Sequence, residues 1–184
     1  MPALSSNSQI FLLKLARDSI RFYLETRTTP LFEIPIEEVK QPGGCFVTLK
    51  KLSTLRGCIG TFEGASPLHE NVIRMAVASA FEDPRFPPVC TEELHDVRIE
   101  LSVLGELRKM NSLEELEIGR HGIWIKFGGR AGTYLPDVAV EQGWSREEFL
   151  EHCAYHKAGL TPEEFKSAEI FLYEVQKFSE AIPD

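Results

Sequence analysis

Residues 55–61, Leu-Arg-Gly-Cys-Ile-Gly-Thr, hold the side chains whose types and spacing could do chemistry. If this segment is a β-strand, Arg56 and Cys58 point to the same face, because side chains alternate along a strand with a period of two. They would then lie roughly 6–7 Å apart, at a rise of about 3.3 Å per residue. A guanidinium at that distance favours the thiolate, lowers the pKa of the thiol and makes Cys58 a stronger nucleophile.

Two glycines flank this cysteine and bear on how it is used. Glycine inside a strand is costly unless backbone, a ligand or a bulge needs the space. Gly57 and Gly60 therefore indicate a kinked, open backbone that another group approaches closely. A packed and inert Cys58 is the alternative, because free cysteines are among the most buried residues in proteins.

The segment Glu-Asp-Pro-Arg-Phe-Pro-Pro at 82–88 predicts a stiff, non-helical loop. Its proline holds Asp83 and Arg85 near each other, and rigid loops of this kind can present the residues of a site. The alternative is an ion pair that only organises its own turn.

His121 and Glu100 are the candidates for a base and an orienting carboxylate. His121 lies in Ile-Gly-Arg-His-Gly just before a predicted strand, and a base need only be near its nucleophile in space. Glu100 lies on the polar, exposed side of another predicted strand. A turn histidine without a catalytic role and an ordinary solvated glutamate are the alternatives.

Two sets of candidate site residues follow from these patterns. The catalytic candidates are Cys58, His121 and Glu100. The candidates for binding a ligand or partner are Arg56, Gly57, Gly60, Thr61, Asp83, Arg85 and Arg120.

Metal and cofactor chemistry are not predicted. His152 and His156 share a face of a predicted helix, but the pattern lacks the glutamate of H-E-x-x-H and an obvious third ligand. Coincidence on a solvated face is the favoured interpretation. The sequence has no phosphate-binding G-x-x-x-x-G-K, no dinucleotide G-x-G-x-x-G after a strand and no G-x-S-x-G elbow. We therefore expect no metal and no cofactor.

Composition narrows the classes of partner. The 184 residues are 43% hydrophobic and 26% charged, which is typical of a globular chain with its own core. A net charge of -8 argues against nucleic acid and against an anionic membrane surface. Four cysteines without a C-x-x-C pair, and no export signal, indicate free thiols in the reducing cytoplasm.

Periodicity and capping signals predict the elements. Helices are expected at residues 8–24, 67–81 and 145–159, with a fourth, short one after Thr161. Ser66 is the expected N-cap of the second, with Pro67 at its first helical position. Strands are expected at residues 45–50, 55–61, 97–103, 123–127, 131–135 and 168–178, with hairpin turns at 52–54 and 128–130. This irregular order of helices and strands predicts a mostly antiparallel α+β fold in a single domain, residues 1–184.

Several ordered motifs together resemble the AMMECR-type domain family. They are residues 55–61, Phe-Val-Thr-Leu at 46–49, the loop at 82–89, Ile-Glu-Leu-Ser-Val-Leu at 99–104, Ile-Gly-Arg-His-Gly at 118–122, and Leu-Pro-Asp-Val-Ala at 135–139 followed by Gly-Trp at 143–144. The match spans about residues 10–178, and both His152 and His156 fall outside its motifs. The resemblance implies a larger lobe built on an antiparallel sheet flanked by helices, a smaller lobe, and a cleft between them. It also implies a compact prokaryotic member that works beside Memo-type and radical-SAM-type proteins.

Two functional interpretations remain open. The first is a binding or regulatory module that holds a protein partner or a small-molecule ligand around residues 55–61. The alternative is a cysteine-dependent enzyme acting on a small molecule, with Cys58 as nucleophile, Arg56 as its activator and His121 as base.

Overall fold

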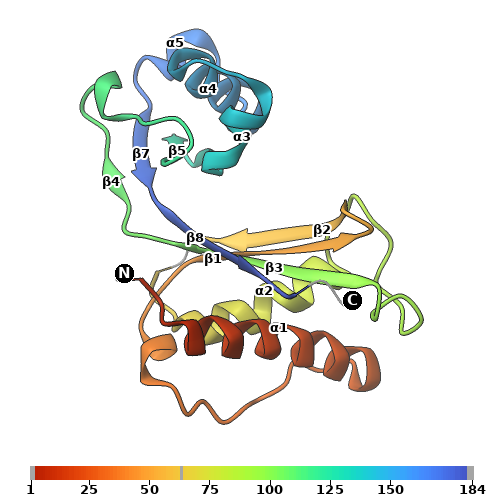
Figure 1. Ribbon diagram of the computed structural model, residues 1–184. Coiled ribbons are helices and arrows are strands. Elements are labelled where there is room, and N and C mark those ends of the chain that lie inside the picture. Colours follow the sequence, from red (N-terminus) through yellow and green to blue (C-terminus); the bar gives the residue numbers. More distant parts are fainter. Residues whose placement is uncertain (1–2, 63, 182–184) are drawn as a thin grey trace. The chain divides into compact units, whose positions relative to one another are not determined.

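The computed structural model describes residues 3–62 and 64–181 (Figure 1). The chain forms two compact units. Unit 1 consists of Met1–Leu104 and Gln176–Asp184, and unit 2 is Gly105–Val175. Each unit is built on a four-stranded sheet. The predicted α+β class with antiparallel sheets is confirmed.

Unit 1 contains two long helices and the first sheet. Its elements are α1 (Ser6–Thr26), a 3-10 turn (Glu37–Lys40), β1 (Cys45–Lys51), β2 (Thr54–Thr61), α2 (Leu68–Phe81), β3 (Val97–Leu104) and β8 (Val175–Ser179). The strand order is β2-β1-β3-β8, so β2 lies at one edge. β1 pairs antiparallel with both β2 and β3.

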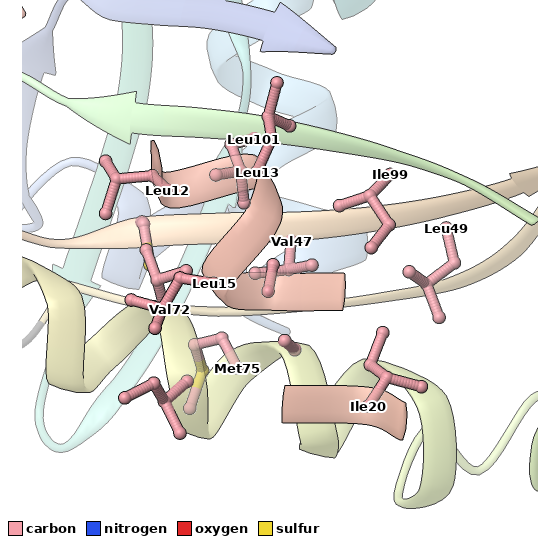
Figure 2. Packing of buried hydrophobic residues seen from close by; sticks show 14 of the residues in the cluster. Leu12, Leu13, Leu15, Ile20, Val47, Leu49, Val72, Met75, Ile99 and Leu101 are labelled. Carbon is pink, nitrogen blue, oxygen red and sulfur yellow. The ribbon is translucent and has the colours of Figure 1, made fainter. Parts of the chain in front are cut away.

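The core of unit 1 lies between this sheet and the two helices, which cover one of its faces (Figure 1). The predicted alternation on β3 is confirmed, since Val97, Ile99, Leu101 and Val103 are all buried. Figure 2 shows side chains of both strands and helices meeting in this layer. The labelled residues are Leu12, Leu13, Leu15, Ile20, Val47, Leu49, Val72, Met75, Ile99 and Leu101. Burial of this apolar surface is the main stabilising term for the unit.

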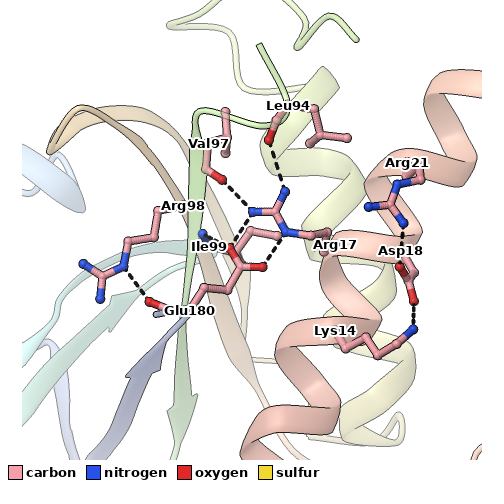
Figure 3. A network of polar contacts seen from close by, with 9 residues as sticks. All are labelled: Lys14, Arg17, Asp18, Arg21, Leu94, Val97, Arg98, Ile99 and Glu180. Carbon is pink, nitrogen blue, oxygen red and sulfur yellow. Dashed lines mark hydrogen bonds and ion pairs between the residues drawn. The ribbon is translucent and has the colours of Figure 1, made fainter. Parts of the chain in front are cut away.

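The chain just after β8 is tied back to the unit by Glu180 (Figure 3). Its carboxylate accepts hydrogen bonds from Arg17 Nε and Nη2 on α1 and from the backbone N–H of Ile99 on β3. Arg98 Nε donates to the carbonyl of Glu180 over 2.8 Å. A forked, bidentate pair of this kind fixes geometry as well as charge.

Unit 2 contains the second sheet, three short α-helices, a 3-10 turn and a π-turn. Its elements are β4 (Arg108–Lys109), a 3-10 turn (Leu113–Glu115), β5 (Gly122–Phe127), β6 (Arg130–Tyr134), α3 (Pro136–Gln142), α4 (Arg146–His152), a π-turn (Cys153–Lys157), α5 (Pro162–Phe165) and β7 (Glu169–Tyr173). The strand order is β4-β7-β5-β6. Both predicted capping boxes, at Ser145 and Thr161, are confirmed.

Two predicted boundaries were wrong. The expected closing strand at 168–178 is two strands, β7 and β8, which belong to different sheets. The N-cap of α2 is Pro67 rather than Ser66, because Pro67 is extended (ψ 142°) and its carbonyl accepts the first helical bond, from Asn71 N. The short helix α3 follows Leu135 and was not predicted.

Within residues 3–62 and 64–181, no helix has both the length and the apolar character of a membrane span.

Candidate functional site

Strand β2 carries a bulge that moves Arg56 away from its predicted place. Leu49 pairs with Gly57 while Lys50 pairs with Leu55, so Arg56 is the extra residue of the bulge. The alternation of side chains is interrupted there, and the prediction that Arg56 and Cys58 share a face was wrong. The Arg56 side chain is 12% exposed and donates from Nε and Nη2 to Glu93, over 3.1 and 2.6 Å.

Cys58 lies in a row that crosses three strands on the sheet face opposite the helices. The register places Thr48 of β1 beside Cys58 on one side and beside Glu100 of β3 on the other. The Sγ of Cys58 is 3.4 Å from Thr48 Oγ1. Burial raises the pKa of this thiol, while the Thr48 hydrogen bond and the charge of Arg85 lower it less strongly. The expected lowering of the thiol pKa was therefore wrong.

Asp83 and Arg85 close the free edge of β2 at Cys58. The backbone N–H of Cys58 donates to Asp83 Oδ2 over 2.9 Å, and Arg85 Nη2 donates to the carbonyl of Cys58 over 3.1 Å. Arg85 also donates to both carboxylate oxygens of Asp83, over 2.9 and 2.7 Å. We call this arrangement the clasp. It satisfies both peptide groups that Cys58 presents at the edge, so the ion pair does more than organise its own turn.

The clasp depends on an ionised Asp83. The hydrogen bonds from Arg85, and those from the backbone N–H groups of Cys58 and Arg85, hold the pKa of the Asp83 carboxyl well below its ordinary value. The carboxylate is buried, whereas the Arg85 side chain is 53% exposed. A positive charge is thus presented at the surface in a fixed position beside the edge of β2.

The two glycines of β2 are explained by the chain's own packing. A Cβ on Gly57 would lie 2.1 Å from the carbonyl oxygen of Ser79 on α2, and one on Gly60 would lie 2.1 Å from the ring of Phe46. The Ser79 hydroxyl accepts from the N–H of Ile59 over 2.9 Å, which holds α2 against β2. The groups that approach this backbone are therefore a helix and an aromatic ring of the same unit.

Glu100 is held more tightly than predicted. Its side chain is 16% exposed and forms ion pairs with Lys50 of β1 (3.2 Å) and Lys177 of β8 (3.3 Å), so the expectation of an exposed carboxylate was wrong. Ser102 lies two residues further on the same face of β3. Its hydroxyl is buried and has no hydrogen-bond partner among the described residues.

His121 and Arg120 belong to unit 2. His121 is buried, and its Nδ1 accepts a hydrogen bond from the backbone N–H of Glu117 over 3.1 Å. This bond assigns the proton to Nε2, and burial lowers the pKa of the imidazole. Arg120 pairs with Glu117 and Glu174. The pairing of His121 with Cys58 stays a prediction, because the two residues belong to different units.

The two histidines four residues apart in unit 2 pack as aromatic rings. His152 stacks on Trp144 with centroids 4.1 Å apart, and His156 stacks on His152 at 5.3 Å. In the described part of the chain, no group of three or more histidine, cysteine, aspartate or glutamate side chains is arranged to hold a metal ion.

Sequence reasoning missed Thr48 as the neighbour of Cys58. A two-residue turn at Leu52 and Ser53, continued without a bulge, would pair Thr48 with Gly57. The bulge at Arg56 shifts this register by one and brings Cys58 opposite Thr48. Glu93, the partner of Arg56, lies in a loop with no pattern that would have predicted the contact.

A pocket of about 340 Å³ lies beside the free edge of β2, past the clasp. Ile59, Gly60 and Thr61 line it on the strand side. On the opposite side, α2 contributes Met75 and Ala78 to the lining. Arg74 and Glu82 also line the pocket. The segment 59–61 is thus both part of the strongest sequence motif and the wall of a pocket.

The comparisons with known proteins agree with these motifs. Residues 13–178 match the AMMECR1 family. Protein MK0488 of Methanopyrus kandleri is 42% identical over 95% of this chain and 89% of its own length, and Protein MJ0810 of Methanocaldococcus jannaschii is 38% identical over 100% and 95%. The crystal structure of uncharacterized protein PH0010 from Pyrococcus horikoshii has a TM-score of 0.86 and 35% identity, covering 94% of this chain and 91% of that one. The chain belongs to the AMMECR1 family.

Proposed function

We propose that this protein is a binding module, and that its ligand or partner contacts the surface formed by residues 55–61 and the clasp. The observation that carries the proposal is the clasp itself. Rigid loops positioned by a packed scaffold are the usual place for binding residues. Here a buried carboxylate holds a half-exposed guanidinium beside a strand edge, which is a preorganised contact for a carboxylate or a backbone carbonyl.

The state of Cys58 supports a binding role over thiol catalysis. A nucleophilic cysteine needs a lowered pKa or an adjacent base. Burial raises the pKa of this thiol, and its near neighbours in unit 1 are a hydroxyl, an ion-paired arginine and two carboxylates. Neither Asp83 nor Glu100 is free to take a proton, because each is engaged in ion pairs. His121 has its Nδ1 lone pair occupied by a backbone N–H.

The rate of alkylation of each thiol against pH separates the two interpretations. Cys90 is exposed, so we expect it to react fastest at pH 7. Cys45 and Cys153 are buried, and burial raises the pKa of each thiol to about 12, so both should stay unreacted in the native protein. Cys58 should react more slowly than Cys90. A Cys58 that reacts faster than Cys90 at pH 7 would instead support the cysteine-dependent enzyme.

The binding role has its own test with purified partners. The Memo-type and radical-SAM-type proteins that the family resemblance suggests would be titrated against the wild type, Arg85→Ala and Arg21→Ala. Arg21 is the matched control, because it is an arginine of unit 1 with similar exposure and one ion pair. We expect Arg85→Ala to weaken binding about tenfold or more, the usual cost of losing a well-placed charged contact, and Arg21→Ala to leave it unchanged.

Thermal unfolding of both variants separates a lost contact from a lost fold. If Arg85→Ala keeps its unfolding temperature within a few degrees and still binds both partners normally, the clasp is not the interface.

A further inference from the structure

We propose that the free edge of β2 at Gly60 binds an extended segment of another protein as an added antiparallel strand. The segment carries an apolar residue followed directly by a basic one. This inference rests on the proposed binding function and names the kind of partner. Strand addition needs three features: unpaired backbone groups at an edge, room beside them, and side-chain contacts that select a sequence.

The unpaired groups are those of Gly60. The peptide groups of a strand in an antiparallel sheet point alternately toward one neighbour and the other. Leu104 N donates to the carbonyl of Gly44. The peptide groups of the even-numbered residues of β1 therefore point toward β3, and those of its odd-numbered residues point toward β2. The peptide N–H and carbonyl of Cys58 accordingly point outward to the clasp. Those of Gly60, two residues further on, point the same way. Neither peptide group of Gly60 bonds another residue within 3–62 and 64–181.

The room is the pocket of about 340 Å³ between this edge and α2. The clasp occupies the edge at Cys58, so an added strand can pair with Gly60 but cannot extend past it toward the bulge. The site is therefore short, with one residue of the partner exchanging both hydrogen bonds with Gly60.

One charge at the C-terminal end of α2 selects the residue that follows that partner residue. Ile59 N bonds Ser79 Oγ and Cys58 N bonds Asp83, so α2 runs antiparallel to β2 and Glu82 lies toward Ile59. Glu82 also lines the pocket. In an antiparallel partner, the residue opposite Ile59 comes directly after the one opposite Gly60. It should be basic to reach Glu82.

The partner residue opposite Gly60 faces the other side of the sheet. Gly60 has no side chain there, and the ring of Phe46 covers its backbone, packed edge-on against Phe62 with centroids 5.7 Å apart. A partner residue paired with Gly60 would place its side chain beside these rings. An apolar side chain is therefore favoured at this position.

The test uses blocked peptides with the core Thr-Thr-Val-Lys, which ends before the clasp, titrated into the isotope-labelled full-length protein and followed by NMR. We expect saturable binding with the amide exchange of Gly60 slowed about tenfold or more at saturation. N-methylation of the valine removes the hydrogen bond to Gly60 and should weaken binding about tenfold. N-methylation of the lysine should change affinity less than about twofold, because that N–H points away from β2.

Charge variants test the direction of the segment. Glu82→Lys should weaken the Thr-Val-Lys peptide several-fold and favour a Thr-Val-Glu peptide, whereas Glu70→Lys, an exposed change on the same helix outside the pocket, should do neither. A reversed Lys-Val-Thr peptide should bind several-fold more weakly than the original.

Three results would overturn the inference. The first is that no peptide binds at concentrations up to about 1 mM. The second is that the valine-methylated peptide binds as tightly as the unmodified one. The third is that protection of the Gly60 amide rises with protein concentration alone, which would mean pairing with a second copy. Any of these, combined with an Arg85-dependent partner titration, leaves the binding function standing and removes only strand addition. If Arg85→Ala also has no effect on partners, both proposals fall.

Discussion

The two edge hairpins, one in each unit, are built on the same plan from different residues. Each joins its strands by two residues in the left-handed region: Leu52 and Ser53 (φ 48° and 65°) between β1 and β2, and Gly128 and Gly129 (φ 53° and 85°) between β5 and β6. Such primed turns match the twist of the strands and favour glycine. The glycine turn fits its conformation, whereas the leucine turn is strained and leaves Leu52 89% exposed.

The outer strands of these hairpins also share a device. Each has glycine where another element packs directly on its backbone. A Cβ on Gly57 of β2 would lie 2.1 Å from Ser79 O, and one on Gly132 of β6 would lie 2.5 Å from Ala158 N, just after the π-turn. The difference is that β2 is held by a helix and also by a charged clasp. Strain and charge are concentrated in the hairpin that carries the strongest family motif, as is common near functional sites.

The largest expected effect comes from filling these close approaches. Gly57→Ala should lower the free energy of unfolding by about 3 kcal/mol, because its obstacle is the rigid backbone of α2. Gly132→Ala meets slightly more distant atoms and should cost about 2 kcal/mol. Urea unfolding measures both.

Gly64→Ala is the control for these substitutions, since the nearest atom to its added Cβ is 4.0 Å away. Its free energy of unfolding should lie within about 0.5 kcal/mol of the wild-type value. A Gly57→Ala protein as stable as Gly64→Ala would show that α2 can move away from β2. The close approach of α2 would then not constrain this edge strand.

The clasp should give the next largest effect. Asp83→Asn removes a buried carboxylate that accepts charged hydrogen bonds. It should lower the free energy of unfolding by about 2 kcal/mol at pH 7. Because folding lowers the pKa of Asp83, its contribution is present above the unfolded pKa of about 3.9 and is lost as the pH falls toward the folded pKa. The stability difference between wild type and Asp83→Asn should therefore narrow from pH 6 to pH 3. A difference that stays constant over this range would contradict the depressed pKa.

The turns should give the smallest effect, with opposite signs in the two hairpins. Replacing Leu52 by Asn and Ser53 by Gly should stabilise the protein by about 1 kcal/mol, since both new residues tolerate the left-handed region. Gly128→Ala or Gly129→Ala should each destabilise it by about 1 kcal/mol. Thermal unfolding would show the two shifts, and a destabilised Asn-Gly variant would mean that Leu52 makes a stabilising contact in spite of its exposure.

Local patterns in the sequence predicted most elements of the fold. Period-two alternation located β3 and its buried face, and the capping boxes at Ser145 and Thr161 located two helix starts, because both signals depend on neighbouring residues only. The segment 168–178 was misjudged because nothing local marks the change from one sheet to the other near Glu174. The strand ends where its pairing partner changes from one sheet to the other. That pairing depends on residues far away in the sequence, which a local pattern does not reveal.

The candidate site was less predictable than the fold for the same reason. The expected Arg56–Cys58 pair failed because one bulge changes the parity of every residue beyond it. A sequence pattern also cannot say that a thiol is buried, or that Glu100 meets Lys177 from the far end of the chain. The closeness of Asp83 and Arg85 was predicted correctly, because proline fixes their mutual position locally. Their contact with Cys58 still required the fold.

The discontinuity of unit 1 has a consequence for biosynthesis. All of unit 2 lies between β3 and β8, so a ribosome must synthesise Gly105–Val175 before the last strand of the first sheet exists. Until Glu180 emerges, Arg17 lacks its carboxylate partner, and β3 presents an unpaired edge of the kind that promotes aggregation. We therefore expect nascent chains stalled after Val175 to be cut readily by protease within β3. Chains extended past Glu180 should resist cleavage there, so unit 1 would complete its folding only after translation of unit 2.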